Sequence, residues 1–293
     1  MKFILTTDTS CDAFKSDLNA HNIPWIPLTY TLDGAEHADN YSSDNEYQAF
    51  YDKLATGAMP TTSQINTFAH EEFFEKVFAN HPDGDIVHLT LSGGLSETVN
   101  SARIAASNMQ ERHASRKVHI VDTLSATQGH NQILDFALEL RETATALEAV
   151  AAIEEYRSKI NAWFMVDDLH HLKRGGRVSK LSAVFGTLLK IKPILTINNE
   201  GKLAVVKKAK GHAGALNFLL EVIAQNKASK DSGAFYVVNA NAHPLVAQLK
   251  EKLQELYPNC PIKGGWIGPV IGAHTGGGTF GLTFEGRERP VNK

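Results

Sequence analysis

The chain has 293 residues, of which 43% are hydrophobic and 21% charged, and its formal net charge is −3. These values are typical of a globular protein long enough for two domains, and they exclude a largely disordered chain. No long basic run occurs, which argues against nucleic acid as a partner. Two cysteines cannot build a disulfide framework, and the apolar run at residues 3–5 is too short for a signal peptide or membrane span. We therefore expect a cytoplasmic protein that does not insert stably into membranes, although transient membrane contact stays open.

The first half of the chain alternates short apolar runs with longer segments of helical periodicity. Strands are predicted over residues 2–7, 24–32, 85–92 and 117–123, and helices over 42–57, over 65–81 and from near Ser96 onward. The last two helices carry apolar stripes expected to face a core, namely Ile65, Phe68, Phe73 and Val77, and then Val99, Ala102, Ala106 and Met109. This alternation favours a mostly parallel sheet, whose ligands usually lie beyond the carboxyl ends of the strands.

The pattern changes near residue 155. The predicted elements are strands over 161–168 and 233–241, a hairpin over 192–210 turning at 199–201, helices over 212–227 and 243–257, and two strands around a glycine-rich bend within 266–284. We therefore predict an α/β protein of two domains. Residues 1–155 form an N-terminal α/β domain with a mostly parallel sheet and flanking helices, and residues 156–293 form a C-terminal mixed α/β domain.

Three polar loops carry candidate binding residues. The candidates are Thr62 and Ser63 in "MPTTSQIN", where a helix is expected to begin, Ser92, Gly93 and Ser96 in "LSGGLSE", and His274 and Thr275 in "GAHTGGG". Taken singly, each loop has a structural interpretation, because hydroxyls before helices are usually caps and glycine pairs usually form turns. Together, hydroxyls, backbone N–H groups and one imidazole predict a site for a small anionic group.

Other motifs are absent or incomplete. No P-loop and no G-x-S-x-G elbow occur, and "GGGTFG" at 276–281 leads into a strand instead of the helix that a dinucleotide site needs. Asp167, Asp168, His170 and His171 lack zincin-like spacing, so we expect neither a metal site nor a cofactor. Arg174 and Arg177 flank two glycines, which leaves either a solvated basic loop or a contact for a phosphate or an acidic partner.

Along nearly its whole length the chain resembles the DegV family of bacterial fatty-acid-binding proteins. The resemblance is carried, in family order, by "TTDTSCD", "PTTSQ", "LSGGLSETVNSA", "VHIVDT", "VDDLHHLKRGGRVS", "LKIKPILTINNEGKL" and "IGAHTGGGTFGL". It implies two α/β domains with a long-chain fatty acid in an interior tunnel between them. It also implies a carrier with no catalytic residue of its own, which presents the acyl carboxylate to a fatty acid kinase.

The resemblance also assigns roles to individual residues. It implies that the carboxylate is held by hydroxyls of Thr62, Ser63, Ser92 and Ser96 beside His274, in loops that also contain Gly93 and Thr275. It implies that Arg174, Arg177 and Lys210 contact the partner or the phosphate.

Four residues depart from the family pattern. Gly93 replaces a serine, Glu97 replaces a glycine, Gly277 replaces a proline, and Lys210 stands where many members have arginine. Glu97 is harmless if it points to solvent on a first helical turn, but it would repel a fatty acid anion if it pointed inward.

Two other functions stay open at this level. The first is a hydrolase, acyltransferase or acyl phosphatase that uses Ser92 or Ser96 with His274. The second is a regulatory module for a small polar molecule, by analogy with dihydroxyacetone kinase substrate domains.

Overall fold

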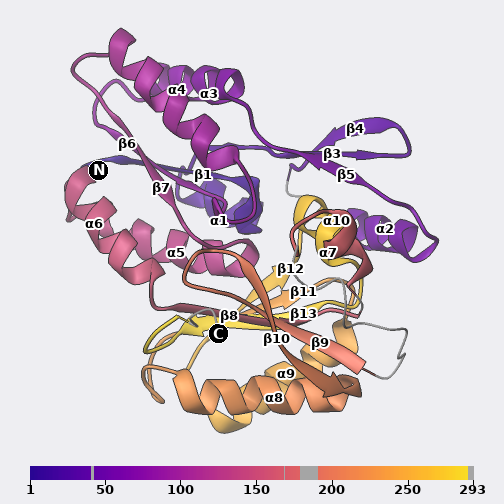
Figure 1. Ribbon diagram of the computed structural model, residues 1–293. Helices are drawn as coiled ribbons and strands as arrows, with labels where there is room; N and C mark the ends of the chain where they lie inside the picture. The colour runs from indigo at the N-terminus through magenta and orange to yellow at the C-terminus, as the bar shows by residue number, and fades with distance from the viewer. Residues whose placement is uncertain (41–42, 168, 179–190, 290–293) are drawn as a thin grey trace.

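The computed structural model describes residues 1–40, 43–167, 169–178 and 191–289, and within these ranges the strands form three sheets (Figure 1). Sheet A has the order β2-β1-β6-β7 and is parallel throughout. Its strands are β1 (Ile4–Asp8), β2 (Trp25–Ile26), β6 (Ile86–Thr90) and β7 (Val118–Asp122). Both β1 and β6 are buried along their whole length, as expected for parallel strands covered by helices on both faces.

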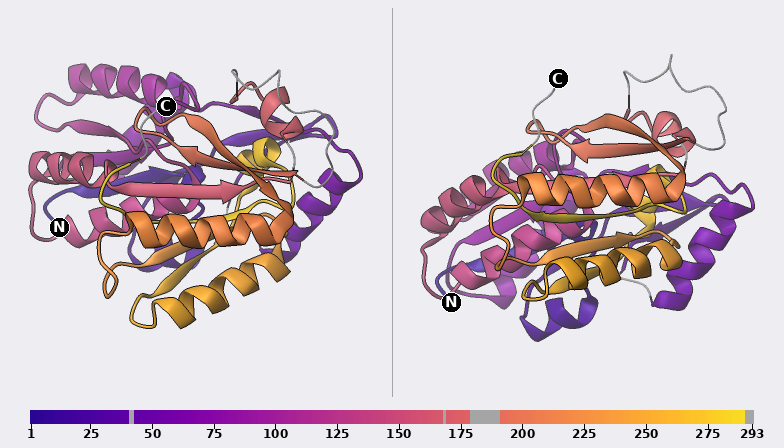
Figure 2. Two further views of the ribbon diagram at one scale, coloured as in Figure 1. Left: turned by 60° about the horizontal axis from the view of Figure 1, so that its bottom comes forward. Right: turned by 90° about the horizontal axis from the view of Figure 1, so that it is seen from below.

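Sheet C is mixed and has the order β10-β9-β8-β13-β11-β12. Its strands are β8 (Ile160–Met165), β9 (Ile191–Ile197), β10 (Leu203–Lys210), β11 (Phe235–Asn239), β12 (Ile262–Trp266) and β13 (Phe280–Glu285). Strand β12 pairs in parallel with β11, and the other neighbours pair antiparallel. The outer face is covered by α8 (Gly211–Asn226) and α9 (His243–Leu256), which lie across it in Figure 2.

The two large sheets stack with helices between and outside them. Helices α3 (Thr67–Asn80) and α4 (Thr98–Arg112) cover the outer face of sheet A, while α5 (Thr127–Leu140) and α6 (Ala146–Arg157) lie on its inner face (Figure 1). The 3-10 helix η1 (Thr9–Cys11) and helix α1 (Lys15–Ala20) follow β1. Helix α5 contacts both sheets, since His130 bonds Thr7 of β1 at 3.0 Å and Gln132 accepts from Thr283 of β13 at 2.9 Å.

A smaller unit stands beside one end of these layers. Sheet B has the order β4-β3-β5, built from β3 (Thr29–Leu32), β4 (Ala35–Ala38) and β5 (Thr61–Ser63). Near it lie α2 (Asp44–Ala55), α7 (His170–Arg174) and α10 (Pro269–Thr275) (Figure 1). Across the described ranges, every helix is too short or too polar to span a bilayer.

The predicted α/β class, with a parallel sheet followed by a mixed one, is confirmed. So is the hairpin, which turns between β9 and β10 with Gly201 at φ 72°. The strands of sheets A and B all precede residue 123 and those of sheet C begin at Ile160, on either side of the predicted boundary. Because α5 packs on both sheets, the division into domains 1–155 and 156–293 stays a prediction.

Several predicted elements are wrong in detail. The strand over 24–32 is two strands in different sheets, because Pro27 between them has no N–H to continue a ladder. Phe68 is 68% exposed, since α3 turns His70, Phe74, Val77 and Phe78 to the core instead. In α4 the predicted stripe holds at Val99, Ala102 and Met109, but Ala105 is buried in place of Ala106.

Two further differences between the predicted and observed elements concern the candidate loops. Thr62 and Ser63 belong to strand β5, and the helix begins only at Thr67, after Asn66 caps it. The first of the two strands around the final glycine-rich bend is in part helix α10, which begins at Pro269. Proline favours a first helical position because its φ is preset and its missing N–H is not needed there. His274 therefore lies on the last turn of a helix, not in a bend.

Three histidines are fully buried around sheet A. His88 shares a hydrogen bond with the Thr6 hydroxyl at 2.9 Å, and His70 bonds the Asn66 carbonyl. Burial lowers the pKa of His70, His88 and His130, and His70 and His130 lower that of His88 further by charge repulsion. All three rings are therefore neutral in the folded protein at neutral pH.

We predict that the protein loses stability steeply in mild acid. The unfolded-state pKa is about 6.5, and the folded-state values are lower, so the unfolded chain binds more protons as the pH falls. The free energy of unfolding is therefore highest above about pH 6.5. Below that pH it decreases by up to about 1.4 kcal/mol per pH unit for each histidine. Urea unfolding at a series of pH values would measure this dependence. The free energy of unfolding should fall less steeply with decreasing pH in His88→Asn than in the wild type. The exposed-site control His21→Asn should keep the wild-type slope, and equal slopes in all three proteins would contradict the prediction.

Candidate functional site

A cavity of about 90 Å³, counted as space for the centres of water-sized atoms, lies between the inner face of sheet C and the loops of sheet A. A single water needs roughly 10–15 Å³ by that measure. The apolar part of its lining comprises Leu28, Leu91, Leu95, Ala126, Ala162, Trp163, Phe164, Leu172, Ile197, Leu203, Val238, Ile267, Val270, Ile271 and Leu282. The polar part comprises Thr62, Ser63, Gln64, Ser96, Thr127, Arg177, His274, Thr275 and Thr283. Both predicted domains contribute to the lining.

Several of the polar residues lie near one another at one end of the cavity. Thr62 on β5 bonds His274 on α10, and Ser96 bonds the Thr98 hydroxyl at 2.9 Å. Arg177 donates from Nε to the carbonyl of Leu95, beside Ser96. Ser63 and Arg177 are exposed, so this polar end of the cavity reaches the surface. The structure thus brings together residues from three separate loops.

His274 is held as a neutral ring at this polar end. Its Nε2 lies 2.8 Å from Oγ1 of Thr62, and its Nδ1 is buried without a hydrogen-bond partner among the described residues. Gly175 makes room for the ring, because a Cβ built there would lie 2.1 Å from Nδ1. Burial, and then repulsion by Arg177, Arg174 and His171, lowers the pKa of His274 to about 4.

Thr275 supplies an unused hydrogen-bonding group. The residue is 8% exposed and lines the cavity, and its Oγ1 is buried with no partner in the described part of the chain. A buried hydroxyl without a partner is costly, so such groups in native structures usually meet a ligand or water.

Ser92 and Gly93 lie outside the cavity lining. The Ser92 hydroxyl donates to the carbonyl of Gly201 at 2.8 Å and accepts from the N–H of Gly94, which anchors the β9–β10 hairpin tip. The N–H of Gly93 bonds the Asp122 carboxylate, and a Cβ at Gly93 would lie 2.8 Å from Asp122 Oδ2. Both residues therefore support the loop that carries Ser96.

The departures from the family pattern also face away from the cavity. Glu97 is exposed at the start of α4 and accepts a hydrogen bond from the Asn100 amide, so its charge points to solvent. Lys210 and Arg174 are exposed and are not part of the lining. A side chain at Gly277 would make only ordinary contacts, the nearest at 3.8 Å.

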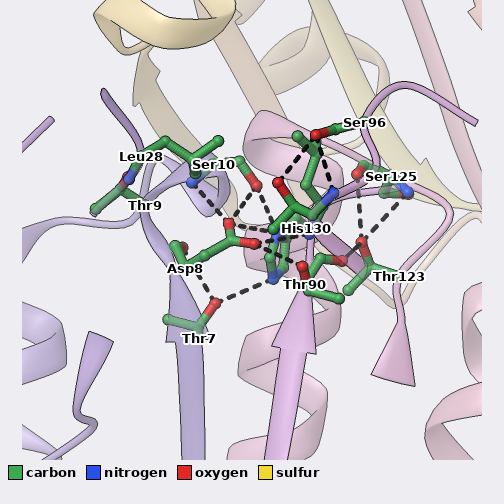
Figure 3. A network of polar contacts seen from close by, with 12 residues as sticks. Thr7, Asp8, Thr9, Ser10, Leu28, Thr90, Ser96, Thr123, Ser125 and His130 are labelled. Atoms are coloured by element: carbon green, nitrogen blue, oxygen red, sulfur yellow. Dashed lines mark hydrogen bonds and ion pairs between the residues drawn. The ribbon is translucent and has the colours of Figure 1, made fainter. Parts of the chain in front are cut away.

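A buried network holds the polar loops from below (Figure 3). Asp8, at the carboxyl end of β1, accepts from both the N–H and the hydroxyl of Ser10. Its other oxygen accepts from the Thr90 hydroxyl at 2.8 Å and from the N–H of Leu91 at 2.9 Å. The motif at residues 6–12 thus positions the loop at residues 91–96 without contacting the cavity.

The geometry provides no nucleophile–base pair at the proposed serines. The Ser92 hydroxyl is bonded to Gly201 and that of Ser96 to Thr98, while His274 bonds Thr62. A catalytic pair normally shares a hydrogen bond of about 2.6–3.2 Å. Of the metal-ligand candidates considered, Asp167 pairs with Lys192 and His212, and Asp168 lies outside the described residues.

Several lining residues give no sequence signal. Ile197 and Leu203 face the cavity from the hairpin, but their sequence is that of ordinary strands. Thr127 at the start of α5 has φ 49°, which is rare for a β-branched residue, and periodicity does not reveal it. Gln64 also lines the cavity, and the sequence indicates this only through its place beside Thr62 and Ser63 in "PTTSQ".

These features define an α/β protein with an apolar cavity that opens at a polar, hydroxyl-lined end. The chain belongs to the DegV family, since the model of that family, which is described as "Uncharacterised protein, DegV family", matches residues 2–287. A DegV domain-containing protein of Clostridium perfringens is 34% identical over 286 residues, which cover 97% of this chain and 98% of the relative.

Solved structures of the family share the fold. A DegV lipid-binding protein from Thermotoga maritima has a TM-score of 0.86 at 28% identity, covering 99% of this chain and 100% of the other. A DegV family protein from Thermus thermophilus that binds fatty acid has a TM-score of 0.86 at 29% identity, covering 98% and 100%.

We predict that Arg177→Gln raises the pKa of His274 above its wild-type value of about 4, because it removes the largest source of charge repulsion while burial remains. An NMR titration of the ring nitrogens would measure this shift. Lys173→Gln, on the exposed side of α7, is the control and should leave the titration unchanged. Identical curves for Arg177→Gln and wild type would show that the guanidinium does not act on the ring.

Proposed function

We propose that this chain binds one long-chain fatty acid, with the acyl chain in the apolar cavity and the carboxylate at its polar end. The observation that carries the proposal is the unpartnered Thr275 hydroxyl at the polar end of a mostly apolar cavity. The fatty acid bound by the relative from Thermus thermophilus supports the same ligand class.

The lining suits each part of such a ligand. Burying a methylene contributes about 0.8 kcal/mol, so the apolar walls account for most of the affinity. The carboxylate needs hydrogen-bond donors, because an unpaired buried charge is very costly. Hydroxyls of Thr275, Ser63, Ser96 and Thr62 are within the lining, and Arg177 adds a positive charge at the opening.

The neutral state of His274 fits a carrier better than a hydrolase. A ring with a pKa of about 4 is a weak base at neutral pH, and the groups that shift this pKa after burial are Arg177, Arg174 and His171, with no carboxylate among them. Acyl transfer by a Ser–His pair needs a stronger base, oriented by a third group. A small polar ligand is disfavoured in turn, because the cavity walls are mostly apolar.

We further propose that a fatty acid kinase is the partner that phosphorylates the bound acid. Arg174 and Arg177 are exposed on or just after α7, beside the polar end of the cavity, and Lys210 is exposed at the start of α8. Exposed cations favour encounter with an acidic protein surface or with the phosphates of a nucleotide. In this scheme the chain itself supplies no catalytic residue.

We predict that Thr275→Val weakens fatty acid binding about 10- to 150-fold while the protein stays folded. The substitution keeps the shape but removes the hydroxyl, and a hydrogen bond to a charged group is worth roughly 1.5–3 kcal/mol. Native mass spectrometry followed by titration with hexadecanoic acid would measure the loss. Thr61→Val, at a threonine of β5 that lies next to Thr62 but outside the lining, is the control. Unchanged affinity in Thr275→Val, or a wild type that neither carries nor takes up a fatty acid, contradicts the proposal.

We predict that Arg174→Glu leaves fatty acid affinity unchanged and slows phosphorylation by the partner about tenfold, since a charge at an interface rim acts mainly on encounter. The assay combines the loaded protein, a fatty acid kinase and MgATP, and traps acyl phosphate with hydroxylamine. Lys250→Glu on α9, which covers the outer face of sheet C, makes the same charge change elsewhere. Ester hydrolysis or acyl transfer without a kinase would favour the enzymatic alternative instead.

A further inference from the structure

A surface groove lies next to the cavity. A groove of about 620 Å³ lies between helices α5 and α6 and the far end of sheet C. It is lined by Gln132, Asp135, Phe136, Glu139, Ala152, Glu155, Tyr156, Lys159, Gly233, Ala234, Tyr236, Pro261, Lys263 and Glu285. The groove is polar where the cavity is apolar, since Tyr236 and Lys263 both donate to the Asp135 carboxylate.

The strand register shows that the cavity and the groove lie one after the other along the inner face of sheet C. Strand β13 begins a few residues after His274 and runs away from it, reaching Thr283 about 10 Å beyond Phe280. Thr283 lines the cavity together with its register partner Ala162, and Glu285, two residues further on, lines the groove. The cavity therefore ends, on the side away from His274, near Thr283.

One hydrogen-bonded side-chain pair joins the two linings, since Thr283 belongs to the cavity and Gln132 to the groove. The Thr283 hydroxyl donates to Oε1 of Gln132 at 2.9 Å, and both residues are 3% exposed. The Gln132 amide donates in turn to the Tyr156 hydroxyl at 3.4 Å, and Tyr156 stacks on Phe136 with ring centroids 4.1 Å apart. The wall is thus a bonded series of side chains from α5, α6 and β13.

We propose that the Gln132–Thr283 pair closes the inner end of the cavity and sets the longest acyl chain that the protein accepts. The inference rests on the proposed function. A chain that reaches this wall meets hydrogen-bonded polar groups, and beyond them the solvated carboxylates of the groove. Further methylenes therefore gain no apolar burial, and the affinity stops rising with chain length.

The test compares saturated acids from tetradecanoic to docosanoic acid in equilibrium binding to the full-length protein. Up to the limit, affinity should rise about fourfold for each added methylene. Gln132→Ala should move the limit to longer acids, because it opens the cavity into the groove. Ala162→Leu should move the limit to shorter acids, because it fills the inner end beside Thr283. The control is Thr6→Val, which removes a buried hydroxyl of sheet A outside both linings and should keep the wild-type limit.

The position of the limit is the decisive readout, since a purely structural loss lowers all affinities together. Shifts in opposite directions for Gln132→Ala and Ala162→Leu support the inference. If Gln132→Ala does not fold, as judged by thermal unfolding, Ala162→Leu alone decides. A wild type that binds these acids, with variants that leave the limit unmoved, overturns this inference only. A wild type that binds none of them overturns the proposed function itself.

Discussion

The packing of helix α5 between two β-sheets is the constraint on which the rest of the structure depends. One side of α5 bonds sheet A through His130, and the other bonds sheet C through Gln132. A helix held between two sheets keeps them apart, and the space at its amino end, next to Ala126 and Thr127, is the apolar cavity. The same helix that opens this space also closes its inner end.

The polar end of the cavity combines hydrogen-bonding groups with a neutral imidazole. Burial beside Arg177 keeps His274 neutral, and the hydroxyl of Thr275 is left without a partner. Arg177 reaches the exposed opening, where water weakens its field. In the proposed function, this site would hold a carboxylate by hydrogen bonds and leave it accessible from outside, as presentation to a partner requires.

The predicted elements are most accurate where local pattern and tertiary role agree. Strands β1, β6 and β7 of sheet A and the β9–β10 hairpin follow directly from apolar runs and turn residues. Helix α5 is absent from the predicted elements, although it is amphipathic and buries Ile133, Leu134 and Ala137. Helix α10 lies within a predicted strand, because a proline and a glycine among its seven residues argue against a helix, whereas the proline in fact begins one.

By itself, the sequence determined the α/β class, the order of most elements and the loops that carry the polar residues. Residue types and their spacing are enough for this, because they are local properties. Only the tertiary structure decided which hydroxyls face the cavity. Ser92 bonds Gly201, 109 positions away, while Thr62 meets His274 across 212 positions. The direction of a side chain depends on such distant partners, and no local pattern in the chain records them.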